Sequence, residues 1–301
     1  MKVCPRTSLL KKWILVSVLT LLSSNCLAEI TLTQANGGTL ELANSADRII
    51  TLAPSLAELV YSAGAGTKLE AVVAYSDFPP EVQNLPLVGD AFRVDLERVI
   101  ELQPDLIIAW QSGNPQAALQ KLSDLGLNVW QVEITRPGEI ADVIDAIAEA
   151  AGTGASGDPQ AELIRGRLAA LETDNAGKAP LSFFYQIASE PLYTVNDDHI
   201  ISRSMQVCGG QNVFSDLPSA APQVSRESVI LADPQVMIAG QLPGQPADAL
   251  NQWLAWPRLQ ATKNKTMVYL PVDDISRAGP RLLDAIESAC QRFDEIRAAN
   301  P

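Results

Sequence analysis

The sequence predicts an α/β protein with two lobes, each built on a central parallel sheet, and one long rigid helix between them. Short apolar runs rich in Val and Ile alternate with helical periodicity both before and after mid-chain. Strands separated by single helices in this way are typical of parallel sheets covered on both faces, as in Rossmann-like folds. Between the two halves, the segment from Asp158 has helix-forming composition for about eighteen residues. A helical connection holds lobes more rigidly than a Gly/Ser linker.

An internal repeat supports the two-lobed organisation. The stretch VDLERVIELQPDLIIA begins at Val94, and VSRESVILADPQVMIA begins at Val224; the two agree at seven of sixteen positions. Unrelated segments of ordinary composition would agree at roughly one position. Each copy predicts a helix followed by a strand, with Glu97 and Glu227 at equivalent places. We therefore expect one copy of this unit in each lobe.

The elements follow one another in order along each half. In the first half, apolar runs predict strands at 48–53, 69–75, 105–110 and 128–133. Periodic segments predict helices at 55–69, 95–102, 115–126 and 137–152, of which the second has Asp95 as its N-cap. The alternation resumes in the second half with segments 181–188, 199–210, 225–234, 235–240, 248–256, 266–272 and 280–299.

These elements imply four parts of the chain. We expect a leader at residues 1–28, an N-terminal lobe at 29–152, an interlobe helix at 153–178 and a C-terminal lobe at 179–301. In such a protein the ligand is expected between the lobes, at the carboxyl ends of the strands.

The first residues have the pattern of a secretory signal peptide. A basic start precedes the ten-residue apolar run Trp13 to Leu22, and small residues lead to Ala28. The run is too short to span a bilayer, so we expect cleavage near Ala28 and export to the periplasm. An uncleaved anchor and a lipid-anchored start at Cys26 are the alternatives.

The charge of the chain limits its partners. The formal net charge is −13, and removing the leader, which carries four basic residues and no acidic ones, makes it −17. Such a surface repels nucleic acid and anionic membranes. After the leader only Cys208 and Cys290 remain. In an oxidising compartment two cysteines indicate one disulfide bond, with two free buried thiols as the alternative.

The residues for common catalytic and metal sites are scarce. His199 is the only histidine, so an imidazole-based metal site is unavailable and a Ser or Cys nucleophile would lack its usual base. We expect His199 at the edge of a strand or loop and not in a catalytic site. The sequence therefore favours binding over catalysis, with no bound metal and no cofactor.

Aromatic residues follow the predicted strands instead. Tyr75 precedes a Pro-Pro turn, Trp110 ends the strand at 105–110, and Tyr193 lies in a predicted loop. Aromatics at strand ends suit a large, flat, partly apolar ligand, although core packing would explain any one of them. Asp273, Asp274 and Arg277 follow the strand at 266–272 and are expected to face the same cleft. Arg277 could donate hydrogen bonds to the ligand or be a solvated arginine at the start of a helix.

Glu97 and Glu227 each lie in the first turn of a helix, where the dipole favours a carboxylate. A local capping role would explain each of them. The alternative is a two-point docking surface, one acid per lobe, for arginine pockets on a partner.

Several motifs in order resemble one family. They are RIITLAPSLAEL, AYSDFPP, LERVIELQPDLIIAW, VCGGQNVF, PQVSRE and RAGPRLL. Over residues 48–295 the chain is similar to the iron-siderophore and cobalamin substrate-binding proteins of ABC-type importers, and AYSDFPP with VCGG and PQVSRE resembles the cobalamin branch. The family has two α/β lobes joined by a single rigid helix.

The resemblance implies roles for particular residues. It implies that cobalamin is the transported ligand, that Cys208 pairs with Cys290, and that Glu97 and Glu227 dock on arginines of the transmembrane permease. The implied ligand contacts are Tyr75, Trp110, Tyr193, Asp273, Asp274, Ile275, Ser276 and Arg277.

The chain also departs from the family pattern. Ala91 and Ala221 stand where the family has tryptophans, and Phe92 is expected to substitute for one of them.

The leading hypothesis is thus a monomeric periplasmic carrier that holds cobalamin between its lobes and is not an enzyme. A haem or ferric-siderophore carrier of the same fold is the first alternative. Two others come from different classes: an exported hydrolase using a carboxylate pair, and a structural or sensor module with no small ligand.

Overall fold

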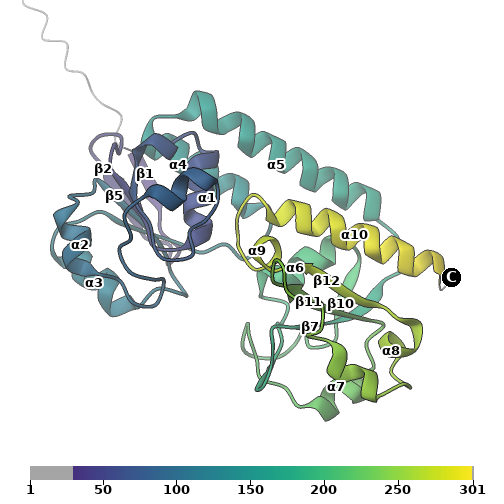
Figure 1. Cartoon of the computed structure of the whole chain (residues 1–301). Coiled ribbons are helices and arrows are strands. Elements are labelled where there is room, and N and C mark those ends of the chain that lie inside the picture. The colour runs from purple at the N-terminus through teal and green to yellow at the C-terminus, as the bar shows by residue number, and fades with distance from the viewer. Residues whose placement is uncertain (1–29, 300–301) are drawn as a thin grey trace, which may run out of the picture.

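The computed structural model describes residues 30–299, so the expected leader and its cleavage site lie outside the described residues. Figure 1 shows two α/β lobes with the long helix α5 (Gly154–Asn175) extending from one to the other. The predicted fold class is confirmed. None of the helices between Ile30 and Ala299 combines the length and apolar character needed to cross a membrane.

The N-terminal lobe contains a parallel four-stranded sheet in the order β4-β3-β5-β6. Its strands are β3 (Ile49–Thr51), β4 (Leu69–Ala71), β5 (Leu106–Trp110) and β6 (Val129–Val132). A hairpin of β1 (Ile30–Thr33) and β2 (Thr39–Leu42) precedes the sheet. The helices are α1 (Pro54–Ser62), α2 (Leu96–Glu101), α3 (Gln116–Asp124) and α4 (Glu139–Ala151), with short 3-10 turns η1 (Gly66–Lys68) and η2 (Pro80–Asn84).

The C-terminal lobe contains a second parallel sheet in the order β10-β7-β11-β12. Its strands are β7 (Leu181–Gln186), β10 (Gly210–Asn212), β11 (Val236–Gln241) and β12 (Met267–Pro271). A small hairpin joins β8 (Ala188–Ser189) to β9 (Leu192–Tyr193). The helices are α6 (Ile200–Val207), α7 (Arg226–Ala232), α8 (Gln260–Asn264), α9 (Val272–Ile275) and α10 (Leu282–Ala299), with the 3-10 turn η3 (Asn251–Ala255).

The two sheets share one topology, which explains the sequence repeat. In each, the second strand along the chain lies at one edge, followed by the first, third and fourth. The first repeat copy forms α2 and then β5, and the second forms α7 and then β11. Both copies therefore supply the third strand of a sheet, in equivalent places. The glutamates at the starts of α2 and α7 are equivalent in the same way.

Apolar side chains alternate between the two faces of each sheet. Ile49 and Phe183 pack into a core shared by both lobes, with α1, α4, α5, α6 and α10. Their neighbours Ile50 and Phe184 point into separate outer cores, one in each lobe. This alternation is expected for strands buried on both faces.

Helix α5 is fixed to a helix of each lobe. At its start Gly157 lies so close to α4 that an added Cβ would come within 2.5 Å of the Ala148 side chain. Farther along, Arg167 forms ion pairs with Asp284 (2.6 Å) and Glu287 (2.8 Å) of α10, which runs beside α5 in Figure 1. Close helix packing and interhelical ion pairs agree with a rigid connection between the lobes.

Candidate functional site

A cleft of about 920 Å³ lies between the two lobes. The N-terminal lobe contributes the start of α1 and the loops that follow β5 and β6, and the C-terminal lobe contributes the start of α6, Ala220 and residues 276–278. The N-terminal wall therefore consists of the carboxyl ends of parallel strands, where ligands of α/β proteins bind. Three of the predicted ligand contacts line this cleft: Trp110, Ser276 and Arg277.

Trp110 is held in place by hydrogen bonds on two sides. Its indole Nε1 donates to Oε1 of Glu133 (3.2 Å), and the other oxygen of Glu133 accepts from the Ser112 backbone N–H (2.9 Å). Its backbone N–H donates to Oδ1 of Asn114 (2.7 Å). The side chain remains 39 % exposed. An anchored and partly exposed indole offers apolar area at low entropic cost.

Asn114, which sequence reasoning missed, connects three segments at this edge of the sheet. It is 4 % exposed, and its Nδ2 donates to the carbonyl of Leu52 (2.8 Å) and to that of Ala91 (2.7 Å). The loop containing Ala91 and Phe92 is thereby tied to the end of β5. Phe92 does not line the cleft itself and is 76 % exposed. Its predicted substitution for an absent tryptophan stays a prediction.

Tyr75 and Tyr193 lie outside the cleft lining. Tyr75 is 80 % exposed, and its φ of +67° lies in the left-handed region that a bulky residue rarely adopts. The expected strand 69–75 ends at Ala71, so Tyr75 belongs to the following loop. Tyr193 was expected in a loop and instead ends β9, where it pairs with Gln223.

A network of charged residues joins the lobes beside the cleft. Glu58 of α1 is 2 % exposed, and its carboxylate binds Arg281 through both oxygens, at 2.7 Å to Nη2 and 3.0 Å to Nε. Arg277 lies 3.4 Å from the same carboxylate and 2.6 Å from Asp77. The guanidinium of Arg281 also lies over the Phe78 ring, 4.5 Å from its centroid. Sequence reasoning missed Glu58 and Arg281.

The acids that follow β12 belong to this network. Asp273 and Asp274 lie in the short helix α9. Asp273 pairs with Arg277 (2.8 Å), and Asp274 pairs with Arg281 (3.0 Å). Neither lines the cleft. Ile275, an implied ligand contact, is fully buried in the shared core. Partial burial raises the pKa of Asp274, an effect that Arg281 opposes.

Arg277 is less available to a ligand than its sequence position suggests. Both of its Nη atoms are engaged by carboxylates, namely Glu58, Asp77 and Asp273. Partial burial of Asp77 acts to raise its pKa. The hydrogen bond and charge of Arg277, together with the charge of Arg281, outweigh this effect, so the pKa of Asp77 is lowered. Arg277 therefore lines the cleft as one half of ion pairs and not as a free cation.

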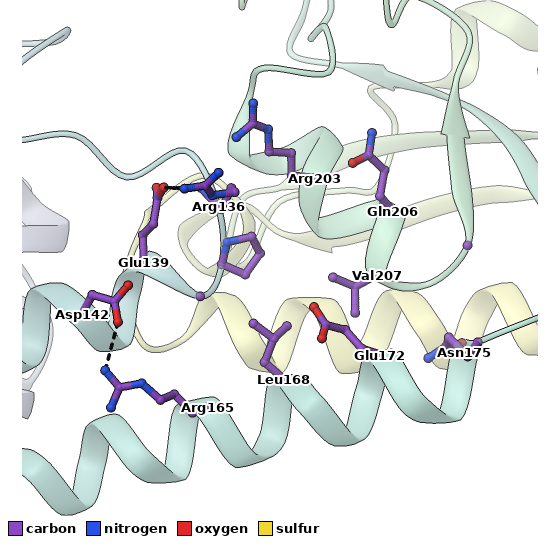
Figure 2. Close-up of a pocket in the computed structure, with 14 residues that line it drawn as sticks. Arg136, Glu139, Asp142, Arg165, Leu168, Glu172, Asn175, Arg203, Gln206 and Val207 are labelled. Carbon is purple, nitrogen blue, oxygen red and sulfur yellow. Dashed lines mark hydrogen bonds and ion pairs between the residues drawn. The ribbon is translucent and has the colours of Figure 1, made fainter. Parts of the chain in front are cut away.

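A second hollow, of about 870 Å³, lies between the start of α4, helix α5 and α6. Figure 2 shows two ion pairs within its wall, Arg136 with Glu139 and Asp142 with Arg165. Among residues 30–299, no aromatic side chain lines this hollow. The cleft next to Trp110 is therefore the better candidate for a flat ligand. Within residues 30–299, no three His, Cys, Asp or Glu side chains gather where they could hold a metal ion.

Glu97 and Glu227 are both exposed at helix starts. Each is in the first turn of its helix, and the N-caps Asp95 and Ser225 accept hydrogen bonds from the backbone N–H groups of Arg98 and Ser228. Neither glutamate forms an ion pair with another residue between Ile30 and Ala299, since Arg98 pairs with Glu101 and Arg226 with Glu190. In Figure 1, α2 and α7 lie on different lobes.

The chain matches the model of a known family over most of its length. The match, to the family described as periplasmic binding protein, covers residues 49–273. The chain belongs to the periplasmic binding protein family. It is 38 % identical over 246 residues to the vitamin B12-binding protein of Vibrio cholerae, which covers 81 % of this chain and 88 % of that protein. The vitamin B12-binding protein of Photorhabdus laumondii is 35 % identical over 248 residues, 82 % of this chain and 88 % of that protein.

Solved periplasmic binding proteins have the same fold. The crystal structure of the periplasmic vitamin B12-binding protein BtuF of Vibrio cholerae aligns with a TM-score of 0.78 and 37 % identity, covering 84 % of this chain and 98 % of that one. The haem-binding protein RhuT of Roseiflexus aligns with a TM-score of 0.71 and 19 % identity, covering 84 % and 99 %. At that identity the likeness to RhuT concerns the fold alone.

Proposed function

We propose that this protein captures cobalamin in the cleft between its lobes and delivers it to an ABC-type importer in the inner membrane, with no chemical change to the ligand. The observation that carries the proposal is the 38 % identity to a vitamin B12-binding protein over 81 % of this chain. The volume of about 920 Å³ suits a large ligand, since small-molecule sites usually measure about 300–1,000 Å³.

The charge of the cleft favours this ligand over haem or a ferric siderophore. Anionic groups need free cations, and Arg277, the one cation in the described cleft lining, is already paired with carboxylates. Glu133 adds negative charge to the same lining, whereas Asp198 there is paired with Arg203 (3.2 Å). Corrinoid side chains end mainly in uncharged amides, which such a cleft accepts more readily than carboxylates.

The proposal includes export and a monomeric state. The leader at residues 1–28 would direct the chain to the periplasm and be removed near Ala28. There the disulfide between Cys208 and Cys290 can form, because the compartment is oxidising.

Trp110→Ala should weaken cyanocobalamin binding at least about tenfold, because it removes an anchored aromatic surface from the cleft wall. Equilibrium dialysis measures this directly, since the ligand absorbs visible light. Leu231→Ala is the matched control, because Leu231 is 88 % exposed on α7 and lies outside the cleft lining. Equal affinities of the Trp110→Ala and Leu231→Ala proteins would contradict the assignment of the cleft.

We further propose that Glu97 and Glu227 dock on arginines of the permease subunits. Their equivalent places in the two lobes support a two-point contact. Both glutamates are exposed, and neither forms an ion pair within the described chain. The carboxylate of Glu227 is hydrogen-bonded to its own backbone N–H and to the Ser225 side chain, which lowers its pKa and keeps it charged. Charge pairs of this kind mainly set orientation and encounter rate.

Glu97→Arg combined with Glu227→Arg should reduce the association rate with the reconstituted importer at least about tenfold, since like charges would then meet. The affinity for cyanocobalamin should not change. Glu172→Arg combined with Asp174→Arg on α5 serves as the control, because it changes the charge by the same amount at two other exposed sites. Importer binding that is equally fast for both proteins would rule out this docking surface.

A further inference from the structure

The charged network beside the cleft has an excess of negative charge. It consists of four acids and two arginines, namely Glu58, Asp77, Asp273, Asp274, Arg277 and Arg281. Two positive charges against four negative ones leave the network with a formal net charge of −2. Of these six residues only Arg277 lines the cleft, so the network meets the cargo at this side chain.

Arg277 is held between carboxylates from both lobes. Its Nη1 donates to Oδ1 of Asp77 at 2.6 Å, and its Nη2 donates to Oδ1 of Asp273 at 2.8 Å. The side chain of Arg277 is 14 % exposed, so water and salt screen these contacts less than they would at the surface. A guanidinium whose charge is compensated in this way attracts a further carboxylate less strongly than a free guanidinium does.

The loop that contains Asp77 is fixed by its own contacts. The backbone carbonyl of Asp77 accepts a hydrogen bond from Nε2 of Gln83 at 3.0 Å. The next residue, Phe78, has its ring 4.5 Å from the guanidinium of Arg281. Asp77 does not line the cleft, and its carboxylate reaches Arg277 from the N-terminal lobe. Any effect of Asp77 on a cargo in the cleft therefore acts through Arg277.

The opposite wall of the cleft adds to the same excess of negative charge. Glu133 lines the cleft, and its carboxylate oxygens accept from Nε1 of Trp110 and from the backbone N–H of Ser112. Both of these donors are uncharged, so the negative charge of Glu133 is not cancelled by them. A cleft whose walls carry one sign of charge focuses the field and disfavours groups of that sign.

We infer that Asp77 sets the charge selectivity of the cleft: its ion pair with Arg277 keeps the one cation of the described lining from capturing anionic groups, so that cargo with uncharged side groups is preferred. Asp77 is a positioning residue in this account, and Glu58 and Asp273 engage the same guanidinium. The inference rests on the proposed function, because it concerns a cargo that occupies this cleft. A corrin ring carries several propionamide side chains, and hydrolysis of one of them replaces a neutral group by an anion of nearly the same size.

The test compares ligands that differ in charge but hardly in shape. Wild type is titrated with cyanocobalamin and with its monocarboxylic acids, and the ratio of the dissociation constants, acid over parent, measures the selectivity. At least one acid should bind about tenfold more weakly than the parent. Raising the salt concentration from about 0.05 to about 0.5 M should reduce this ratio at least about twofold, because salt screens charge but does not change shape.

Asp77→Asn removes the charge but keeps a side-chain oxygen that can accept from Arg277. It should reduce the ratio for that acid at least about threefold and change the affinity for cyanocobalamin less than about twofold. Asp77→Asn combined with Asp273→Asn, which brings the formal charge of the network to zero, should reduce the ratio about tenfold. Glu70→Gln is the matched control, because it removes one acid from an ion pair with Arg48 outside the cleft lining, and it should keep the wild-type ratio.

Two further variants show whether Asp77 acts through Arg277. Arg277→Gln alone should increase the ratio at least about threefold, because no cation then remains in the described cleft lining. Asp77→Asn combined with Arg277→Gln should have a ratio no lower than that of wild type, since the formal charge of the network is the same in both proteins. A reduced ratio in this double variant would contradict the role given to Arg277.

Each failure has its own signature. A wild type that binds cyanocobalamin and every monoacid equally well would overturn the inference and leave the proposed function standing. So would a ratio for Asp77→Asn that is no lower than the ratio for Glu70→Gln. A wild type that binds no cyanocobalamin would overturn the proposed function itself.

Discussion

Glu58→Gln should lower the free energy of unfolding by about 3 kcal/mol, because it removes a buried carboxylate and leaves the partly buried guanidinium of Arg281 without its bidentate partner. Glu58 is 2 % exposed and contacts two arginines of the other lobe. Removing the buried carboxylate leaves the charge of Arg281, whose side chain is 21 % exposed, with less compensation and limited access to water. Asp274 retains its contact with Arg281, which limits the loss.

Urea unfolding, followed by circular dichroism, measures the effect. Glu70→Gln is the matched control, because the Glu70–Arg48 pair (3.2 Å) is partly exposed and such pairs contribute only about 0–1 kcal/mol. If Glu58→Gln destabilised the protein no more than Glu70→Gln, the network between the lobes would be structurally unimportant.

Replacing Cys208 and Cys290 together with alanine should lower the free energy of unfolding by about 4 kcal/mol, since the bond closes a long loop in the unfolded chain. The two cysteines are 82 residues apart in the sequence and bonded in the structure. The disulfide expected from the sequence is therefore confirmed. It connects the end of α6 to the middle of α10.

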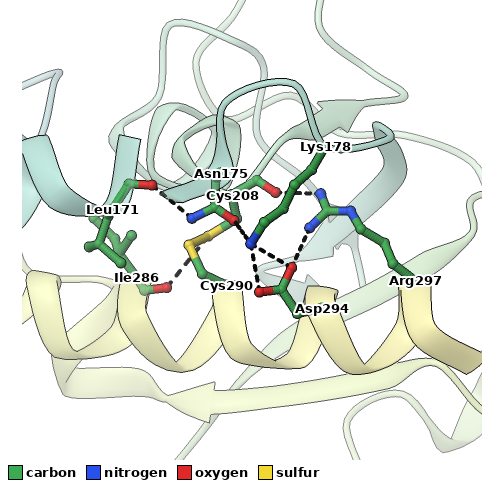
Figure 3. The surroundings of a disulfide bond; sticks show 8 residues. All are labelled: Leu171, Asn175, Lys178, Cys208, Ile286, Cys290, Asp294 and Arg297. Atoms are coloured by element: carbon green, nitrogen blue, oxygen red, sulfur yellow. Dashed lines mark hydrogen bonds and ion pairs between the residues drawn. A yellow bond between two sulfur atoms is a disulfide. The ribbon is translucent and has the colours of Figure 1, made fainter. Parts of the chain in front are cut away.

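The surroundings of the bond favour a structural role. Both cysteines are buried, and Arg297 of α10 donates to the Cys208 carbonyl at 2.6 Å (Figure 3). Asp294 binds both Lys178 (2.7 Å) and Arg297 (2.9 Å) beside it. Guanidinium unfolding of the variant and the oxidised wild type measures the difference. A loss below about 1 kcal/mol would mean that these contacts hold α6 and α10 together without the disulfide.

The fold could be predicted from the sequence because its determinants are local. Alternating apolar runs and helical periodicity identify strands and helices one by one, and the repeat at Val94 and Val224 indicates that two lobes share a topology. The strand ends were less accurate. The apolar run that begins at Leu69 continues past Ala71, but only its first three residues pair in the sheet.

The candidate site was predicted only in part, for a different reason. Trp110 is visible because it ends a strand, whereas Glu58 and Arg281 are 223 residues apart and no local pattern connects them. The same network changes the interpretation of Asp273, Asp274 and Arg277. Their charges are directed at one another and at Glu58, so they are less available to a ligand than their position after β12 suggested.

Gln111 and His199 line the cleft, and neither was expected there from the sequence. A glutamine after a strand and a lone histidine before a helix are ordinary features of a sequence. Only the three-dimensional contacts show that Oε1 of Gln111 has no partner in the described chain and that His199 is fixed through Nδ1.

Calorimetric titration of the chain from Glu29 onward with cyanocobalamin tests the central claim most directly, with haemin and a ferric siderophore titrated in parallel. We expect one cobalamin per chain with a dissociation constant in the micromolar range or tighter, about −8 kcal/mol or better, and no binding heat from the other two ligands. Binding of haemin or the siderophore without any binding of cobalamin would contradict the account.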